Sequence, residues 1–134
     1  MAVVLDSDAV VGFLDRNDAL HASADTAIRD LVGRERLLVS AVTYAEVLTG
    51  ARLGHHDEKQ VKGFFRDLIS DVLPVDENVA DVAADLRARR KSLRMPDAMI
   101  LATAEIQPEV GLVLTGDLEA TKVRGLTCKV QLLR

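Results

Sequence analysis

Four carboxylates in this chain stand where a strand is expected to end or a helix to begin: Asp6, Glu46, Asp97 and Asp117. Two carboxylates about 4 Å apart repel each other by about 4 kcal/mol at an effective dielectric constant of about 20. Four of them gathered at one place would therefore need protons or a cation to neutralise them. A set of oxygen ligands without Cys or His is what Mg²⁺ and Mn²⁺ prefer. The four acids are thus a candidate site for one of these ions, provided that the fold brings them together.

Each acid also has an ordinary structural explanation. Asp6 could cap the helix that follows it. Glu46 could close a capping box with Thr43. Asp97 could interact with the positive end of a helix dipole, and Asp117 could be a turn residue. For any one acid the structural explanation is the better one, so the metal-site hypothesis depends on all four lying together.

The elements that must position these acids can be predicted from the apolar patterns. Short apolar runs predict strands at residues 3–5, 37–39, 72–75, 112–114 and 127–132. Helical spacing and capping residues predict helices at residues 9–14, 18–32, 43–53, 57–69, 78–93 and 97–106. Pro74 favours an edge position for the third strand. This alternation predicts an α/β fold, with a parallel sheet of about five strands flanked by helices, in a single domain over residues 1–134.

In open parallel sheets, ligands bind outside the carboxyl ends of the strands. Asp6 directly follows the first predicted strand, and Asp117 closely follows the fourth. Glu46 lies in the first turn of the helix after the second strand. The helix that Asp97 opens leads into the fourth strand, so it must descend from the carboxyl edge. We therefore expect all four acids at the same edge of the sheet.

Composition and charge restrict the class of protein. The net charge of −4 argues against a protein that coats nucleic acid by bulk attraction, although it allows an enzyme that acts on it. The single Cys128 makes neither an internal disulfide nor a zinc cluster. No apolar run reaches the roughly 18 residues of a membrane span. We expect a cytoplasmic protein without membrane association.

A basic run leads directly into the third acid. Four of its cations are predicted to share one helical face, as a guide for RNA phosphates beside the acidic edge: Arg87, Arg90, Lys91 and Arg94. The alternative is an ordinary solvated face, with Asp85 paired to Arg89.

With these residues in view, the chain resembles the PIN-domain ribonucleases, particularly the VapC-type toxins of bacterial toxin–antitoxin pairs. The resemblance covers essentially the whole chain and implies a PIN-like α/β/α sandwich. The order and spacing of four motifs carry it: Asp6-Ser7, Thr43-Tyr44-Ala45-Glu46-Val47, the run from Pro96 to Ala104, and Leu114-Thr115-Gly116-Asp117. The third motif is the most specific.

The resemblance implies Mg²⁺-dependent hydrolysis of RNA phosphodiester bonds, with Mn²⁺ as a substitute. Asp6 and Asp97 would be direct metal ligands. Asp117 would complete the site directly or through water. Glu46 would hold a metal-bound water or a second ion, and Thr115 would orient its neighbours. The resemblance also implies a homodimer that is inhibited by a small VapB-type antitoxin, whose C-terminal segment would occupy the active-site groove.

Two residues depart from the family pattern. Asp8 stands where the family more often has Ser or Asn, which adds a charge and leaves the number of ions open. Gly116 replaces a larger residue before the fourth acid.

Two other classes of protein compete with the nuclease. A signalling receiver domain would use Asp76 as its phosphoacceptor and Thr115 as the hydroxyl partner, but it leaves Glu46 and Asp97 unexplained. A catalytically silent interaction domain would use the acids only as helix caps.

Overall fold

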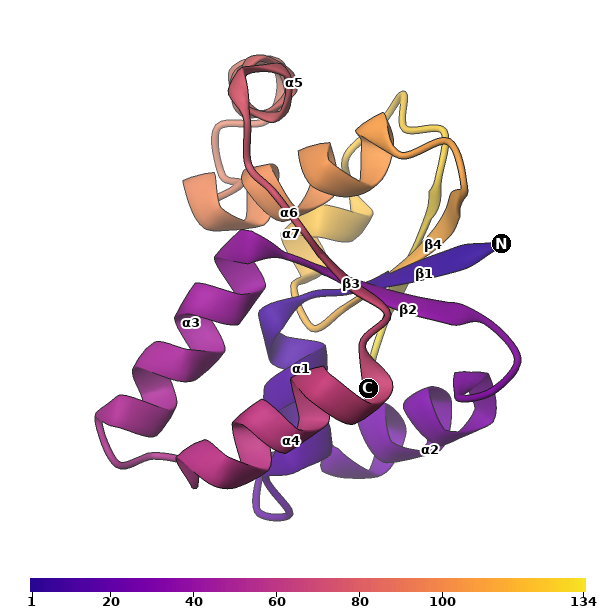
Figure 1. Ribbon diagram of the computed structural model, residues 1–134. Helices are drawn as coiled ribbons and strands as arrows, with labels where there is room; N and C mark the ends of the chain where they lie inside the picture. Colours follow the sequence, from indigo (N-terminus) through magenta and orange to yellow (C-terminus); the bar gives the residue numbers. More distant parts are fainter.

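A computed structural model describes all residues 1–134. Five strands form one sheet in the order β3-β2-β1-β4-β5, and every neighbouring pair is parallel (Figure 1). The strands are β1 (Ala2–Leu5), β2 (Arg36–Ser40), β3 (Asp71–Leu73), β4 (Val110–Thr115) and β5 (Lys129–Leu132). The predicted parallel α/β sheet is confirmed.

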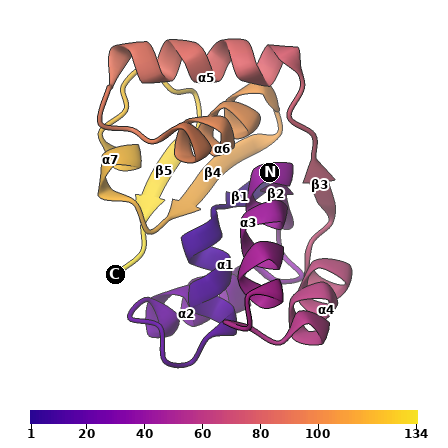
Figure 2. The ribbon, with the colours of Figure 1, turned by 90° about the vertical axis from the view of Figure 1, so that its left-hand side faces the viewer.

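Helices cover both faces of this sheet. They are α1 (Ser7–Leu14), α2 (His21–Leu31), α3 (Ala41–Arg52), α4 (Glu58–Leu68), α5 (Glu77–Arg89), α6 (Met95–Ile106) and α7 (Leu118–Thr121). Figures 1 and 2 show α5, α6 and α7 on one side of the sheet, and α1 to α4 on the other. The predicted α/β/α sandwich is therefore confirmed. None of the seven helices has the length and hydropathy of a membrane span.

The core is divided between the two faces by the alternation of side chains along the strands. Val4 and Leu38 face the layer of α5 and α6, whereas Val3 and Leu37 face the layer of α1 to α4. All four side chains are buried. Successive side chains of a strand point to opposite faces, so these short, wholly apolar strands fit a sheet that is covered on both sides.

The start of α3 differs from the sequence prediction. The strand β2 runs on to Ser40, whose hydroxyl accepts a hydrogen bond from the amide of Val42 at 3.1 Å and caps α3. Thr43 is buried inside the helix. The predicted capping box of Thr43 and Glu46 is therefore wrong, and Glu46 is released for another contact.

The end of α5 also differs, because the chain turns to bury a leucine. The helix stops at Arg89, Arg90 adopts an extended conformation, and a turn brings Leu93 into the core with no exposed surface. Only the first of the four predicted RNA-binding cations is helical, so the prediction of a shared helical face is wrong for the set Arg87, Arg90, Lys91 and Arg94.

The sheet order removes the receiver alternative. In a receiver the strand order 2-1-3-4-5 places the third strand beside the first. Here β3 is an edge strand, as Pro74 predicted, and β2 separates it from β1. Asp76 caps α5 by accepting a hydrogen bond from the amide of Val79 at 3.0 Å. Asp76 is therefore a structural cap, and its prediction as a phosphoacceptor is wrong.

Candidate active site

The acids lie at the carboxyl end of the central strands. β1 stands between β2 and β4, so the chain leaves the sheet in opposite directions on either side of it. Such a switch point is where open α/β sheets bind ligands. Asp6 follows β1 and caps α1, and Asp117 follows β4 and caps α7. Asp97 lies in the first turn of α6, and Glu46 in α3.

Asp6 is a buried carboxylate with an ordered set of donors. It is 5% exposed. Its Oδ1 accepts a hydrogen bond from the amide of Ala9 at 2.8 Å, and its Oδ2 accepts from the hydroxyl of Thr115 at 2.5 Å and the amide of Gly116 at 3.2 Å. Burial raises the pKa of Asp6 to about 7, although the hydrogen bond from Thr115 opposes this shift. The nearby charge of Asp8 adds to it. A cation beside this carboxylate would favour its ionised form.

Asp97 is the second buried carboxylate, with 9% of its surface exposed. Pro96 before it helps to start α6, because proline suits the first helical turn. Its Oδ2 accepts a hydrogen bond from Nε of Arg94 at 2.9 Å. Burial raises the pKa of Asp97, and the charge of Asp117 raises it further, while Arg94 acts in the opposite direction. Both buried acids thus lie in surroundings that disfavour a free negative charge.

Glu46 is exposed, and Ser7 holds it in place. The hydroxyl of Ser7 donates a hydrogen bond of 2.6 Å to Oε1 of Glu46. It also lies 3.4 Å from the hydroxyl of Thr43. The sequence analysis placed Ser7 in the Asp6-Ser7 motif but gave it no role of its own, so its contact with Glu46 was not predicted.

Most of these side chains face one small cavity of about 90 Å³. Six polar or charged residues line it, together with Val11 and Val47: Asp6, Ser7, Asp8, Glu46, Arg94 and Asp97. Asp117 does not line the cavity, but its charge raises the pKa of both Asp8 and Asp97. Three of the four predicted acids therefore share the cavity, and the fourth lies close enough to act on it electrostatically.

The carboxylate and hydroxyl oxygens that line the cavity suit a hard divalent cation, but in this structure the side chains do not form a coordination shell. No three carboxylates, imidazoles or thiols are grouped closely enough to hold a metal ion. Instead the guanidinium of Arg94 is the cation among the acids, since Asp97, Glu46 and Asp117 all raise its pKa. The Arg94 side chain is 71% exposed and can turn toward solvent. The all-oxygen donor set then fits Mg²⁺ or Mn²⁺.

The predicted RNA-binding cations separate in the structure. Arg87 turns back onto its own chain and donates a hydrogen bond to the carbonyl of Lys91 at 2.7 Å. Arg90 pairs with Glu119 at 2.9 Å. Among the four predicted cations, only Arg94 lines the acidic cavity.

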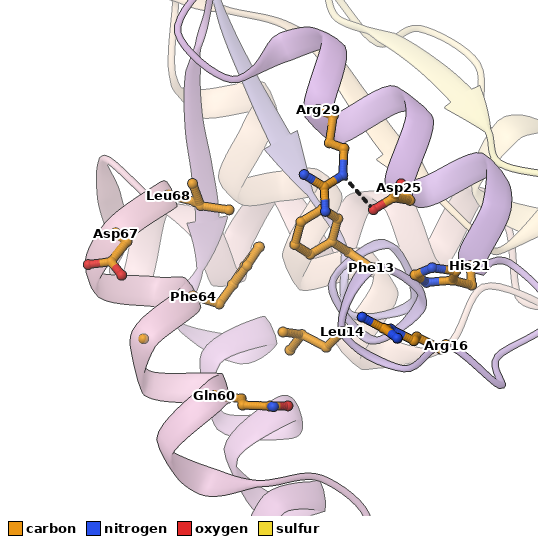
Figure 3. Close-up of a pocket in the computed structure, with 11 residues that line it drawn as sticks. Phe13, Leu14, Arg16, His21, Asp25, Arg29, Gln60, Phe64, Asp67 and Leu68 are labelled. Atoms are coloured by element: carbon orange, nitrogen blue, oxygen red, sulfur yellow. Dashed lines mark hydrogen bonds and ion pairs between the residues drawn. The ribbon is translucent and has the colours of Figure 1, made fainter.

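The largest hollow lies elsewhere. It has a volume of about 760 Å³ between α1, α2 and α4, and Phe13 and Phe64 are neighbours in its lining, with ring centroids 5.5 Å apart (Figure 3). The ion pair of Arg29 and Asp25, at 2.8 Å, stands at its border (Figure 3). None of the four acids lines this hollow, so size alone would have pointed away from the acidic site.

Comparison with known proteins identifies the family. A family model described as the PIN domain matches residues 3–126. The chain belongs to the PIN domain family. This confirms the resemblance that the four motifs indicated, and the PIN domain fold agrees with the sheet order and the helical layers. No curated protein sequence matches the chain.

Solved structures share this PIN domain fold. VapBC2 of Rickettsia felis, bound to a DNA fragment from its promoter, matches with a TM-score of 0.76 and 12% identity, and all of both chains is covered. FitAcB of Neisseria gonorrhoeae matches with a TM-score of 0.70 and 22% identity, over 96% of this chain and 95% of the other. VapC20 of Mycobacterium tuberculosis, a toxin described as cleaving the Sarcin-Ricin loop, matches with a TM-score of 0.71 and 15% identity, over 91% and 96%. At these identities the likeness is one of fold.

Proposed function

We propose that this PIN domain is a metal-dependent endoribonuclease and the toxin of a toxin–antitoxin pair. One observation carries the proposal: Asp6 and Asp97, two buried carboxylates, face the same small cavity at the carboxyl ends of the central strands. Arg94 neutralises Asp97, but no cation pairs with the buried Asp6, and burying an unpaired charge is costly. A divalent cation held by both carboxylates would remove this cost. VapC20, which has the same fold and is described as a toxin that cleaves the Sarcin-Ricin loop, supports this choice of reaction.

The residues would divide the work as follows. Asp6 and Asp97 would hold Mg²⁺ or Mn²⁺, and Asp117 would complete the site directly or through water. When bound, the cation would lower the pKa of a water molecule and neutralise charge on the scissile phosphate. Thr115 keeps Asp6 in a fixed orientation through its 2.5 Å hydrogen bond. Ser7 holds Oε1 of Glu46, which leaves Oε2 to orient the attacking water.

Arg94 would change partner during this reaction. Its guanidinium pairs with Asp97 as long as no other cation neutralises that carboxylate. With Asp97 neutralised in another way, the largely exposed Arg94 side chain would be free to leave it for the mouth of the cavity. A guanidinium there can bind a phosphate with two parallel hydrogen bonds.

For partners, we propose a homodimer inhibited by a small VapB-type antitoxin whose C-terminal segment occupies the acidic cavity. Several structures with this fold are toxin–antitoxin complexes, including those from Rickettsia felis and Haemophilus influenzae, which supports an antitoxin partner. We also propose a cytoplasmic location, because the substrate is cellular RNA, and one PIN-like domain over residues 1–134.

Expression in bacteria tests the function. We expect the wild type to stop growth and to create new 5′ ends in cellular RNA within a short induction. Asp6→Asn and Asp97→Asn should do neither at equal protein levels. Asp81→Asn, which alters an exposed acid on α5, is the matched control and should behave as the wild type. Growth arrest by Asp97→Asn, or new RNA ends with Asp6→Asn, would contradict the proposal. No new RNA ends with the wild type would support a silent interaction domain instead.

A further inference from the structure

A second cleft, of opposite charge, lies where the end of α5 meets the chain after α7, and it shares no lining residue with the acidic cavity. Its volume is about 270 Å³. Four of the five lining residues are cations from the end of α5 and from the chain after α7; the lining comprises Arg89, Arg90, Lys122, Val123 and Arg124. Figure 2 shows α7 below the C-terminal end of α5, where these two segments meet.

The cleft carries an excess of positive charge that its own contacts do not neutralise. Glu119 is the carboxylate that pairs with these cations: Oε2 lies 2.9 Å from Arg90, and Oε1 lies 3.7 Å from Lys122. Ser92 donates a further hydrogen bond of 2.6 Å to Glu119. Four cations against this one carboxylate leave a local charge of about +3 in a chain whose net charge is −4. An anionic ligand is therefore favoured at this place.

A hydrogen bond between a side chain and the backbone fixes the two segments that line the cleft. Arg89 donates a hydrogen bond of 3.0 Å to the carbonyl of Arg124, which ties the segment after α7 to α5. Gly125 follows with a φ of +81°, and a Cβ there would lie 2.9 Å from the guanidinium of Arg89. Glycine thus permits both the left-handed turn and the tether.

The cleft is close to the acids along the chain. The side chain of Asp117 accepts a hydrogen bond from the amide of Glu119 at 3.0 Å. Glu119, which pairs with the cations of the cleft, therefore lies in the first turn of the helix that Asp117 caps. Arg90 lines the cleft and Arg94, four residues later, lines the acidic cavity. Four residues span at most about 14 Å. A strand cleaved at the acidic cavity would therefore reach the cleft within a few nucleotides.

We propose that this basic cleft binds a backbone phosphate of single-stranded RNA, beside the phosphodiester that is cleaved at the acidic cavity. The inference rests on the proposed function for the cleavage step. Arginine matches a phosphate with paired hydrogen bonds. No aromatic side chain lines the cleft on which a base could stack, so binding there positions the strand without reading its sequence.

Binding of a short labelled single-stranded RNA tests the cleft without cleavage, in a chain inactivated by Asp97→Asn. The test variant adds Lys122→Gln and Arg124→Gln. The matched control adds Arg34→Gln and Lys62→Gln, which remove the same charges from exposed residues after α2 and on α4. Affinity is measured by fluorescence anisotropy over a series of salt concentrations.

We expect the salt slope of log K to fall by about 0.7 for each phosphate that the test variant no longer binds, and to stay unchanged in the control. The reduction in affinity should be equal for RNAs of different sequence. Equal slopes in both variants would overturn the proposal, as would a reduction that depends on sequence. If an acidic protein segment is the true ligand, RNA binding stays unchanged in the test variant, which likewise overturns the proposal.

A kinetic arm uses the same substitutions in the otherwise wild-type chain. We expect a raised KM with an unchanged kcat, because the cleft touches only the strand beside the reacting phosphate. A lowered kcat at unchanged KM would overturn this placement. If the wild type cleaves no RNA but the salt slope falls as expected, the proposed nuclease function is wrong, while RNA binding by the cleft is supported. If it cleaves RNA and the slopes are equal, only the cleft fails.

Discussion

The hydroxyl of Thr115 lies 2.5 Å from Oδ2 of Asp6, although 109 positions separate them in the chain. The same hydroxyl oxygen accepts a hydrogen bond from the amide of Asp117 at 2.9 Å. The pairing of Leu5 with Leu114 in neighbouring parallel strands sets this contact. One buried hydroxyl therefore orients two of the four acids.

Replacing Thr115 by valine keeps its shape and removes both hydrogen bonds. We expect metal affinity and kcat/KM each to fall by about 10–100-fold, the usual effect of removing a group that orients a metal ligand. Stability should fall by about 1–3 kcal/mol, because two buried polar groups lose a partner. Calorimetric Mn²⁺ titration and cleavage kinetics measure the effect, with the exposed Thr49→Val as control. Unchanged metal affinity would remove the orienting role.

Gly116 and Asp8, the two departures from the family pattern, are in contact. A Cβ at position 116 would lie 2.7 Å from Cβ of Asp8 and 2.6 Å from Leu20. We expect Gly116→Ala to destabilise the protein by about 1–3 kcal/mol in urea unfolding. Gly63→Ala is the control, because its nearest neighbour is a flexible Arg66 atom at 3.7 Å in a helix. It should stabilise by up to about 1 kcal/mol. The same sign in both variants would contradict the close contact.

Arg94 competes with a divalent cation for the acids. Arg94→Gln should therefore tighten Mn²⁺ binding, by up to about fivefold, since a largely exposed ion pair contributes up to about 1 kcal/mol. Arg29→Gln is a close control, because the Arg29 side chain is also 71% exposed and pairs with an acid in the same way. Weaker Mn²⁺ binding by Arg94→Gln in calorimetry would show that the guanidinium supports the metal site instead of competing for it.

The raised pKa of Asp6 makes stability depend on pH. Burial moves this pKa from its ordinary value of 3.8 to about 7, so the folded state holds the proton more tightly than the unfolded state. Without divalent cations, stability should be highest below pH 4 as far as Asp6 is concerned, and should fall by at most about 4 kcal/mol as pH rises to 7. Burial raises the pKa of Asp8 and Asp97 in the same direction.

Urea unfolding over this pH range, in wild type and Asp6→Asn, isolates the contribution of Asp6. The variant should have the flatter profile, and added Mg²⁺ should stabilise the wild type most at neutral pH. Parallel profiles for the two proteins would contradict the assignment.

Much of the sheet could be predicted because its strands are short apolar runs between polar residues. The position of Asp97 followed from chain length, since a helix that feeds a parallel strand must start at the carboxyl edge. The predicted helix boundaries were wrong where the burial of particular residues outweighed the helical spacing of apolar side chains. The burial of Leu93 ends α5 early, and α3 begins at Ala41, two residues before the predicted start, with Ser40 as its cap. The helix α7 has only four residues and carries no periodic signal.

Contacts between distant side chains could not be predicted from spacing. Ser7 reaches Glu46 because two helices begin at the same edge of the sheet. Arg89 meets the chain after α7 across 35 positions. The site was predictable where an acid terminates a strand, and unpredictable where tertiary packing chooses its partners.

Metal-dependent cleavage of single-stranded RNA by the purified protein tests the central claim most directly. We expect cleavage in Mg²⁺ or Mn²⁺, none in EDTA, and recovery when the metal is restored. Asp97→Asn should be inactive while it unfolds cooperatively, and Asp81→Asn should be fully active. Cleavage that persists in EDTA, or full activity of Asp97→Asn, would contradict a metal-dependent nuclease built on Asp6 and Asp97.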